Sequence, residues 1–368
     1  MNLDKGLPSL AKLVDSQTPI PQGIGSFGSS TKDVLDIFAY TQVAVNGDNV
    51  YFSFTDMIDH QSGVYSVPIS GGAVSMLFNQ STQKPGAAPG TFLGTFSFDS
   101  LNVNGSDILA VTGEYIGKGS FKFDTSTGTL SSMFNQEACH FRPAGGIPEP
   151  YYMNNNLLTL RATSDEYFSK NAIIAGPYSE MANSDPTCFN LSSPYIIASE
   201  KDIVPGTESN PRTFDSDAEG SGILTPYFGF PKIDAGTVVF SGAAKPISIP
   251  GIIGTNHDLW GLYSSTIDPD RKICKLVDTQ TPVPGGTGNF LPSSFQSPKF
   301  LISGDNIVFT GASTNPLDLL HPEVGVYLMS KNGDSLTKIA SSTDTRAKAY
   351  LVSFSGNHLT YGFSAQSE

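Results

Sequence analysis

The sequence predicts an all-β protein, a six-bladed β-propeller of four-stranded antiparallel blades, and three observations lead to this prediction. The string KLVDSQTPIPQGIGSF at Lys12–Phe27 returns almost unchanged as KLVDTQTPVPGGTGNF at Lys275–Phe290, which indicates a repeated unit. Hairpin turns rich in Asn, Asp and Gly recur between short apolar strands. The 368 residues include 37 Gly and 24 Phe but only 15% charged residues, a composition that suits pleated sheets joined by tight turns.

Each repeat is predicted to contain two hairpins. The first hairpins turn at NGDN, NGSD, NNN, DAG, SGDN and SGN, and the strands that leave these turns are apolar, as in VYFSF and IVFTG. The second hairpins begin with a glycine close to an aromatic residue, as in GVY, GSF and GLY. There are six first hairpins in 368 residues, about 60 residues for each. Four-stranded units repeated in this way are typical of a β-propeller.

The two ends of the chain predict how the ring closes. The last repeat supplies two strands, and the first residues of the chain align with the other two. We therefore expect N-terminal strands to join the C-terminal blade, because a closed ring leaves no sheet edge open. This predicts one monomeric domain over 1–368. The expected blades span 26–82, 87–137, 140–202, 205–282, 284–343, and 346–368 together with 1–20.

The string LVDTQTPVPGGTGNF, with GLY ahead of it and SGDNIVFTG after it, resembles a group of bacterial propeller repeat proteins whose units carry a TPxPGG inter-blade link. The resemblance covers the whole chain and is closest at the two copies of the link. It implies a propeller fold and no particular activity, because the group is uncharacterised.

Charge and hydropathy exclude several classes of partner. The net charge of −13 argues against nucleic acid and anionic lipid, which both need Lys and Arg to neutralise phosphate. No apolar run is long enough to cross a membrane. The N-terminus lacks the apolar segment of a signal peptide, which fits either a cytosolic protein or the mature part of an exported one. Few Lys and much Asn, Ser, Thr and Gly favour export, so we expect a secreted, periplasmic or cell-surface protein.

Loop lengths predict which face of the propeller binds. In an up-and-down blade, the loops between the second and third strands share one face with the links between blades. The long insertions 164–187, 243–260 and 312–324 all fall in such loops. Long loops on a rigid scaffold often carry function, so we expect the binding surface on this face. Neutral drift of loop length is the alternative.

Candidate ligand-binding side chains lie in or beside these loops. They are His60, Tyr167, Tyr178, His257, Trp260 and His321. Histidines can bind metal or shuttle protons, although histidines of turns also bond the backbone. Aromatic side chains can stack on sugar rings or anchor a protein partner. Trp260 precedes a predicted strand, so a position in the hydrophobic core is an equal alternative to ligand binding for this residue.

Calcium is the cofactor that the sequence suggests, and a disulfide is a further candidate. Asp215, Asp217 and Glu219 match the first half of a calcium loop, although Pro226 occupies the position of the bidentate glutamate, and a solvated acidic insertion is the alternative. Cys139 and Cys188 fall in the same repeat and can bridge in an oxidising compartment.

No catalytic motif is evident. The glycine-rich link opens no helix and lacks the Lys-Ser/Thr of a phosphate-binding loop, so we interpret it as a structural connection. The sequence therefore predicts a binding module that presents its loop-rich face to a glycan or a protein. The alternatives are a polysaccharide hydrolase or lyase with its site at the channel mouth, and a structural unit of a larger surface protein.

Overall fold

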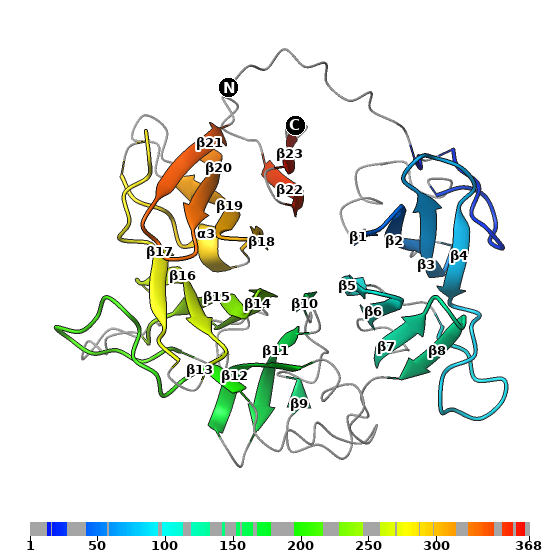
Figure 1. The fold of residues 1–368 in the computed structure, drawn as a ribbon, viewed down its shortest axis with the longest axis horizontal. Helices are drawn as coiled ribbons and strands as arrows, with labels where there is room; N and C mark the ends of the chain where they lie inside the picture. The colour runs from blue at the N-terminus through cyan, green and yellow to red at the C-terminus, as the bar shows by residue number, and fades with distance from the viewer. Residues whose placement is uncertain are drawn as a thin grey trace. The chain divides into compact units, whose positions relative to one another are not determined.

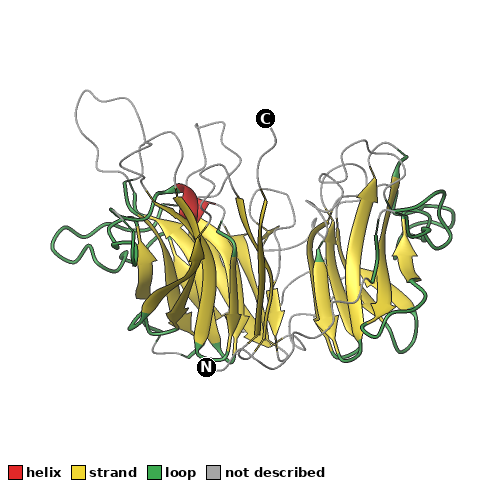
Figure 2. Cartoon of the chain, turned by 90° about the horizontal axis from the view of Figure 1, so that it is seen from above, coloured by secondary structure: helices red, strands yellow, loops and turns green. Residues whose placement is uncertain are grey.

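The computed structural model describes most of the strands and several connections of the chain. The described residues are 13–15, 17–27, 42–56, 59–94, 98–112, 119–132, 142–143, 152–154, 157–164, 168–177, 195–215, 228–245, 258–268, 271–286, 288–296, 298–313, 323–341, 348–355 and 358–364. Their regular structure is strand, apart from the short helix α3, Ser293–Gln296 (Figure 2). Among these residues, no helix has the length and apolar character needed to cross a membrane.

The chain divides into two compact units, Met1–Asn135 and Gln136–Glu368, and each is described by itself. The first unit holds two four-stranded sheets, blades 1 and 2 (Figure 1). Blade 1 is β1 (Val43–Asn46), β2 (Asn49–Asp56), β3 (Gln61–Pro68) and β4 (Ser75–Asn79). Blade 2 is β5 (Phe98–Asn104), β6 (Asp107–Thr112), β7 (Gly119–Asp124) and β8 (Thr129–Ser132). The first strands of the two blades, β1 and β5, contact each other, as inner strands of neighbouring propeller blades do.

The second unit holds blades 3, 4 and 5 and one further hairpin. Blade 3 is β10 (Tyr152–Asn154), β11 (Leu157–Ser164), β12 (Phe168–Pro177) and β13 (Tyr195–Ser199), with β9 (Arg142–Pro143) paired to β11. Blade 4 is β14 (Phe228–Asp234), β15 (Thr237–Ala243), β16 (Trp260–Thr266) and β17 (Cys274–Asp278). Blade 5 is β18 (Phe300–Ser303), β19 (Asn306–Ser313), β20 (Glu323–Ser330) and β21 (Leu336–Ser341). The last hairpin is β22 (Lys348–Ser355) and β23 (His358–Ser364).

The prediction of a β-propeller with four-stranded antiparallel blades is confirmed, but the predicted number of blades is wrong. Among the described residues the structure has five blades, and β22 and β23 form a two-stranded sheet. The described part of 1–20 contains no strand, since Pro19 makes only an isolated bridge with Ser26. Residues 1–12 lie outside the described residues. Turn chemistry predicts hairpins, which are local, whereas completing a sixth blade requires pairing between the two chain ends, which no local signal encodes. The prediction of a single domain over 1–368 stays a prediction.

An aromatic triad explains the recurring glycine-aromatic strings. In blade 5, the ring of Phe290 meets the ring of Tyr327 edge-on at 4.9 Å, and Phe309 stacks on Tyr327 at 5.4 Å. The equivalent triads are Phe27, Phe52 and Tyr65 in blade 1, and Phe214, Phe240 and Tyr263 in blade 4. The first phenylalanine always comes from the link that precedes the blade, so each triad fixes the link to the blade that follows it.

The glycine two residues before each tyrosine makes room for the triad. A Cβ on Gly325 would lie 2.8 Å from the hydroxyl oxygen of Tyr327, and a Cβ on Gly261 would lie 2.6 Å from the carbonyl oxygen of Val277. Burial raises the pKa of Tyr327 to about 12, so this phenol stays neutral. Within the described residues, the hydroxyl groups of Tyr263 and Tyr327 have no hydrogen-bond partner.

Candidate functional site: the link loops

The links between blades are compact loops with a common backbone design. In the part of the chain that the structure describes, four link loops are each closed by an isolated antiparallel bridge, and the residue after that bridge is buried. The bridges are Pro19 with Ser26, Gln83 with Phe92, Ile203 with Thr213, and Pro282 with Asn289. The buried residues that follow are Phe27, Leu93, Phe214 and Phe290. The connections that the sequence identified as links are therefore folded units with their own hydrogen bonds.

A reciprocal cap explains the Asp-x-x-Thr string that opens the link. In the N-terminal loop, Asp15 Oδ1 accepts hydrogen bonds from Gln17 N at 3.1 Å and from Thr18 Oγ1 at 2.8 Å. The amide of Asp15 in turn donates to Thr18 Oγ1 at 3.0 Å. Asp278 with Thr281, and Asn79 with Thr82, repeat this arrangement. Side chains that bond neighbouring backbone groups favour turns over strands, so at Asn79 and Asp278, the last residues of β4 and β17, this cap ends the strand and starts the loop.

The tip of the N-terminal loop has a demanding backbone. Gln22 has a positive φ of 57°, and Gly25 has a φ of 79°. A Cβ on Gly23 would lie 2.6 Å from the Oε1 atom of Gln61. A positive φ is costly for a residue other than glycine and persists only where the surroundings determine it. The equivalent of Gln22 in the sister loop is Gly285, which has a φ of 64°.

The side chain of Ile24, at the tip of this loop, is exposed to solvent, whereas its backbone is held by hydrogen bonds. Its side chain is 82% exposed. The amide of Ile24 donates to Gln61 Oε1 at 2.9 Å, and Gln61 Nε2 donates to the carbonyl oxygen of Ile24 at 2.9 Å. Gln61 is only 6% exposed and belongs to β3 of the same blade. Two hydrogen bonds from a buried side chain therefore hold an apolar residue in a defined place on the surface.

The loop between blades 1 and 2 is stabilised by a glutamine of its own. The side chain of Gln83 donates to the carbonyl oxygen of Ala88 at 3.0 Å and accepts from the amide of Gly90 at 2.9 Å. Phe92, the bridge partner of Gln83, is 57% exposed, whereas Leu93 beside it is buried. This second loop of the Met1–Asn135 unit therefore also presents a large apolar side chain from a fixed backbone.

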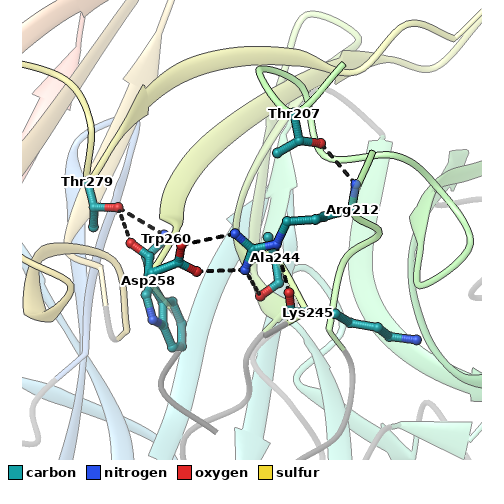
Figure 3. A network of polar contacts seen from close by, with 7 residues as sticks. All are labelled: Thr207, Arg212, Ala244, Lys245, Asp258, Trp260 and Thr279. Atoms are coloured by element: carbon teal, nitrogen blue, oxygen red, sulfur yellow. Dashed lines mark hydrogen bonds and ion pairs between the residues drawn. The ribbon is translucent and has the colours of Figure 1, made fainter. Parts of the chain in front are cut away.

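In the Gln136–Glu368 unit, Arg212 fastens the loop between blades 3 and 4 (Figure 3). Its guanidinium donates to both carboxylate oxygens of Asp258, at 2.6 and 3.1 Å. Arg212 Nε donates to the carbonyl oxygen of Lys245 at 2.8 Å, and Nη2 donates to that of Ala244 at 3.4 Å. The hydrogen bond from Arg212, together with its charge, lowers the pKa of Asp258. Arg212 thereby ties its loop to blade 4 on both sides of the segment 246–257.

Thr279 extends this network into the next link. Its hydroxyl group donates to the carbonyl oxygen of Asp258 at 2.8 Å and accepts from the amide of Trp260 at 3.3 Å (Figure 3). The side chain of Trp260 is 1% exposed and packs in the hydrophobic core of blades 4 and 5. Trp260 thus occupies the core position that the sequence left open as an alternative, and its part in ligand binding stays a prediction.

Several of the exposed large hydrophobic residues among the described residues lie on the link loops. The exposed large hydrophobic residues are Ile24, Val43, Val45, Ile69, Phe92, Ile203 and Ile339. Three of them, Ile24, Phe92 and Ile203, lie on link loops, and each of these loops is internally hydrogen-bonded. Rigid apolar side chains bind at a smaller entropic cost than mobile ones, because less freedom is lost on contact. The link loops are therefore suited to hold another molecule by apolar contact.

The structure describes three of the residues that the sequence singled out for binding or metal. Besides Trp260, His60 is exposed in the turn before β3, with a φ of 52°. Asp215 is 6% exposed, and its amide donates to the carbonyl oxygen of Ala243 at 2.9 Å. The other predicted residues lie outside the described residues. These are Cys139, Tyr167, Tyr178, Cys188, Asp217, Glu219, His257 and His321.

The predicted calcium site and the predicted disulfide stay predictions, because Asp217, Glu219, Cys139 and Cys188 lie outside the described residues. Within the described part of the chain, no three His, Cys, Asp or Glu residues gather into a metal-binding group. Cys274, at the start of β17, is a free and partly exposed thiol. Sequence reasoning missed Ile24, Phe92 and Arg212, because it interpreted the links as purely structural. One signal in the sequence could have found Ile24. The two link strings are almost identical, yet the first has the apolar Ile24 at the position where the second has Thr287.

The strand order and the contacts between first strands identify the sheets as propeller blades. No family model and no curated protein matches the sequence. Among solved structures, an alpha-L-arabinanase from Penicillium chrysogenum complexed with arabinobiose is similar at 12% identity and a TM-score of 0.43, over 89% of this chain and 92% of that chain. The β-propeller domain of the Trilobed protease from Pyrococcus furiosus is similar at 10% identity and a TM-score of 0.41, over 89% and 90% of the two chains. A Nidogen/Laminin complex is similar at 11% identity and a TM-score of 0.36, over 80% and 75%. Similarities this distant carry no functional inference.

Proposed function

We propose that the protein is a binding module whose link loops anchor a protein partner through apolar side chains. The observation that carries this proposal is the fastening of Ile24, an 82% exposed side chain whose backbone is held by two hydrogen bonds from the buried Gln61. An exposed isoleucine is common on protein surfaces, but this one sits on a backbone with a positive φ at Gln22. Strained backbone that is held in place by its surroundings is concentrated at functional sites.

The energetics favour a protein rather than a sugar at this loop. Burying an isoleucine side chain in an interface contributes about 1.5–3 kcal/mol, which makes it a candidate hot spot. A hydroxyl-rich glycan gains little from an aliphatic side chain, because sugar rings stack on aromatic faces. Glycan binding, polysaccharide cleavage and a structural role in a larger surface protein remain predictions from the sequence. We also propose that the protein is exported to the cell surface, the periplasm or the medium, and that it is a member of the group of propeller repeat proteins with the TPxPGG link.

Photo-crosslinking from position 24 tests this function. A photoreactive amino acid at position 24 is expected to capture a defined protein from the envelope or culture fluid of the source cells. The same group at position 287, in the sister loop, is the matched control and is expected to capture none of that protein. The proposal fails when both positions give the same products, or when position 24 gives none.

A further inference from the structure

The two link loops of the Met1–Asn135 unit are fastened to neighbouring residues at the start of β3. Gln61, the first residue of β3, holds the backbone of Ile24 with two hydrogen bonds of 2.9 Å. Ser62, the next residue, donates its amide to Gln80 Oε1 at 3.0 Å, and its carbonyl oxygen accepts from the amide of Gln80 at 3.0 Å. Two consecutive residues of one strand therefore position both loops.

The loop that begins at Gln80 presents Phe92 at a limited distance from Ile24. The carbonyl oxygen of Gln80 accepts a hydrogen bond from the amide of Gly94 at 2.9 Å, and Phe92 lies two residues before Gly94. This path of hydrogen bonds and covalent links limits the separation of the Cα atoms of Ile24 and Phe92 to roughly 30 Å. An interface of standard size, about 800 Å² on each partner, is about 30 Å across. Both side chains therefore fit into a single interface.

The loop design does not require a large apolar side chain at Phe92. The residues at the same place in the bridges of the other three described loops are Ser26, Thr213 and Asn289, all of them polar. Phe92 is nevertheless 57% exposed. Burying such a side chain contributes about 1.5–3 kcal/mol. Phe92 is therefore suited, like Ile24, to contribute binding energy when another molecule covers it.

The two loops carry little charge in a chain with a net charge of −13. Residues 17–27 contain no Asp, Glu, Lys or Arg, and residues 80–94 contain Lys84 alone. A charged group of a partner that was buried against these loops would lose its hydration, and only Lys84 could offer it an opposite charge. The surface that complements the two loops is therefore apolar and uncharged.

We propose that Ile24 and Phe92 form one two-point docking site for a single protein that presents an uncharged apolar surface. This inference rests on the proposed function, which it extends from one side chain to two loops and to the chemistry of the partner. Because Gln61 and Ser62 are adjacent in a paired strand, the spacing of the two anchors is set before binding, which lowers the entropic cost of binding. Interface cores are likewise depleted of charged residues.

Photo-crosslinking from position 92 in the full chain is the first test. We expect a photoreactive amino acid there to capture the protein that position 24 captures, as identified by mass spectrometry, and the same group at position 69 to capture none of it. Ile69 is the matched control, because it is 51% exposed in the same unit and follows the last residue of β3, at the opposite end of the strand from Gln61. Capture from position 24 but not from position 92 overturns the two-point site and leaves the proposed function standing, whereas no capture from position 24 overturns both.

Titration calorimetry with the purified captured protein is the second test. Phe92→Thr, which installs the residue of a sister loop, is expected to weaken binding about 10-fold. Phe92→Leu, which keeps an apolar side chain, should retain most of the affinity, and Ile69→Thr should leave it unchanged.

The same titrations at two salt concentrations test the chemistry of the partner. Raising the sodium chloride concentration from about 0.05 to about 0.5 M should change the affinity less than about 3-fold, because salt screens contacts between charges and not apolar ones. Equal affinities for the wild type and Phe92→Thr overturn the two-point site, and a steep loss of affinity with salt overturns the uncharged partner surface.

Discussion

Replacing Arg212 by methionine is expected to destabilise the Gln136–Glu368 unit by about 3 kcal/mol. The methionine keeps the aliphatic packing but removes the bidentate bond to Asp258 and the bonds to the carbonyl oxygens of Lys245 and Ala244. The side chain of Asp258 is 59% exposed, so water weakens the ion pair to about 1 kcal/mol or less. Each of the two carbonyl bonds contributes about 1 kcal/mol, which with the ion pair brings the expected loss to about 3 kcal/mol.

Urea denaturation followed by tryptophan fluorescence measures this loss. Trp260 is the single tryptophan of the chain and lies in the same network, so its emission reports on the unit that Arg212 stabilises. Asp258→Asn is the matched control, because it removes the charge of the partner and leaves both carbonyl bonds. We expect it to cost about 1 kcal/mol or less. A loss below about 0.5 kcal/mol for Arg212→Met, which is within the range of neutral surface substitutions, would refute the reasoning, as would equal losses for the two variants.

The same ion pair predicts a pH dependence. The pKa of Asp258 is lowered in the folded protein, so its contribution is fully present above the ordinary aspartate pKa and is lost as the pH falls through the lower folded value. Asp258→Asn should therefore lose less stability than the wild type when the pH is lowered into this acid range. Denaturation midpoints of the two proteins at neutral and acid pH measure the difference, and identical acid sensitivity contradicts it.

Three further predictions concern the blades. Gly325→Ala is expected to cost about 2 kcal/mol of stability through the contact with Tyr327, and Tyr327→Phe should recover part of that loss. Tyr263→Phe should not rescue Gly261→Ala, because the new Cβ there meets a backbone oxygen. Thermal denaturation of the single and double variants measures both effects. Tyr263→Phe alone removes a buried hydroxyl group without a partner in the described residues and should leave the denaturation midpoint unchanged or raise it, so a clear loss of stability contradicts the assignment. Burial lowers the pKa of Lys232 from 10.5 to about 8, so its charged form costs stability below pH 8, and this cost disappears as the pH rises toward 10.5. Lys232→Met should therefore be more stable than the wild type at pH 7, with a difference that shrinks by pH 10. A stability difference that stays constant with pH would count against the lowered pKa.

Local chemistry made the strands predictable. The turn NGDN between β1 and β2 places Gly47 at a φ of 55°, and such turns identify a hairpin without any knowledge of the rest of the fold. The number of blades was not predictable in the same way. It depends on which strands meet β22 and β23, a pairing between distant parts of the chain. Counting hairpins gave six blades, whereas the described residues form five.

The candidate site was even less accessible from the sequence. Gln61 is 37 residues from Ile24, and Arg212 is 46 residues from Asp258, so neither contact has a local signature. The sequence predicted that the long insertions beside the links carry the function, and it interpreted the links themselves as structural connections. The exposure of Ile24 depends on how the tip of the loop is held. The hydrogen bonds from Gln61 show this, and the sequence does not.

The affinity of the partner captured from position 24 tests the central claim most directly. Titration calorimetry compares the wild type with Ile24→Thr, which installs the residue of the sister loop, and with Thr287→Ile, which makes the reciprocal change. The account predicts that Ile24→Thr weakens binding about 10- to 100-fold, while Thr287→Ile leaves the affinity unchanged. Gln61→Leu, which releases the loop and keeps Ile24, should also weaken binding. Equal affinities for the wild type and Ile24→Thr would contradict the account.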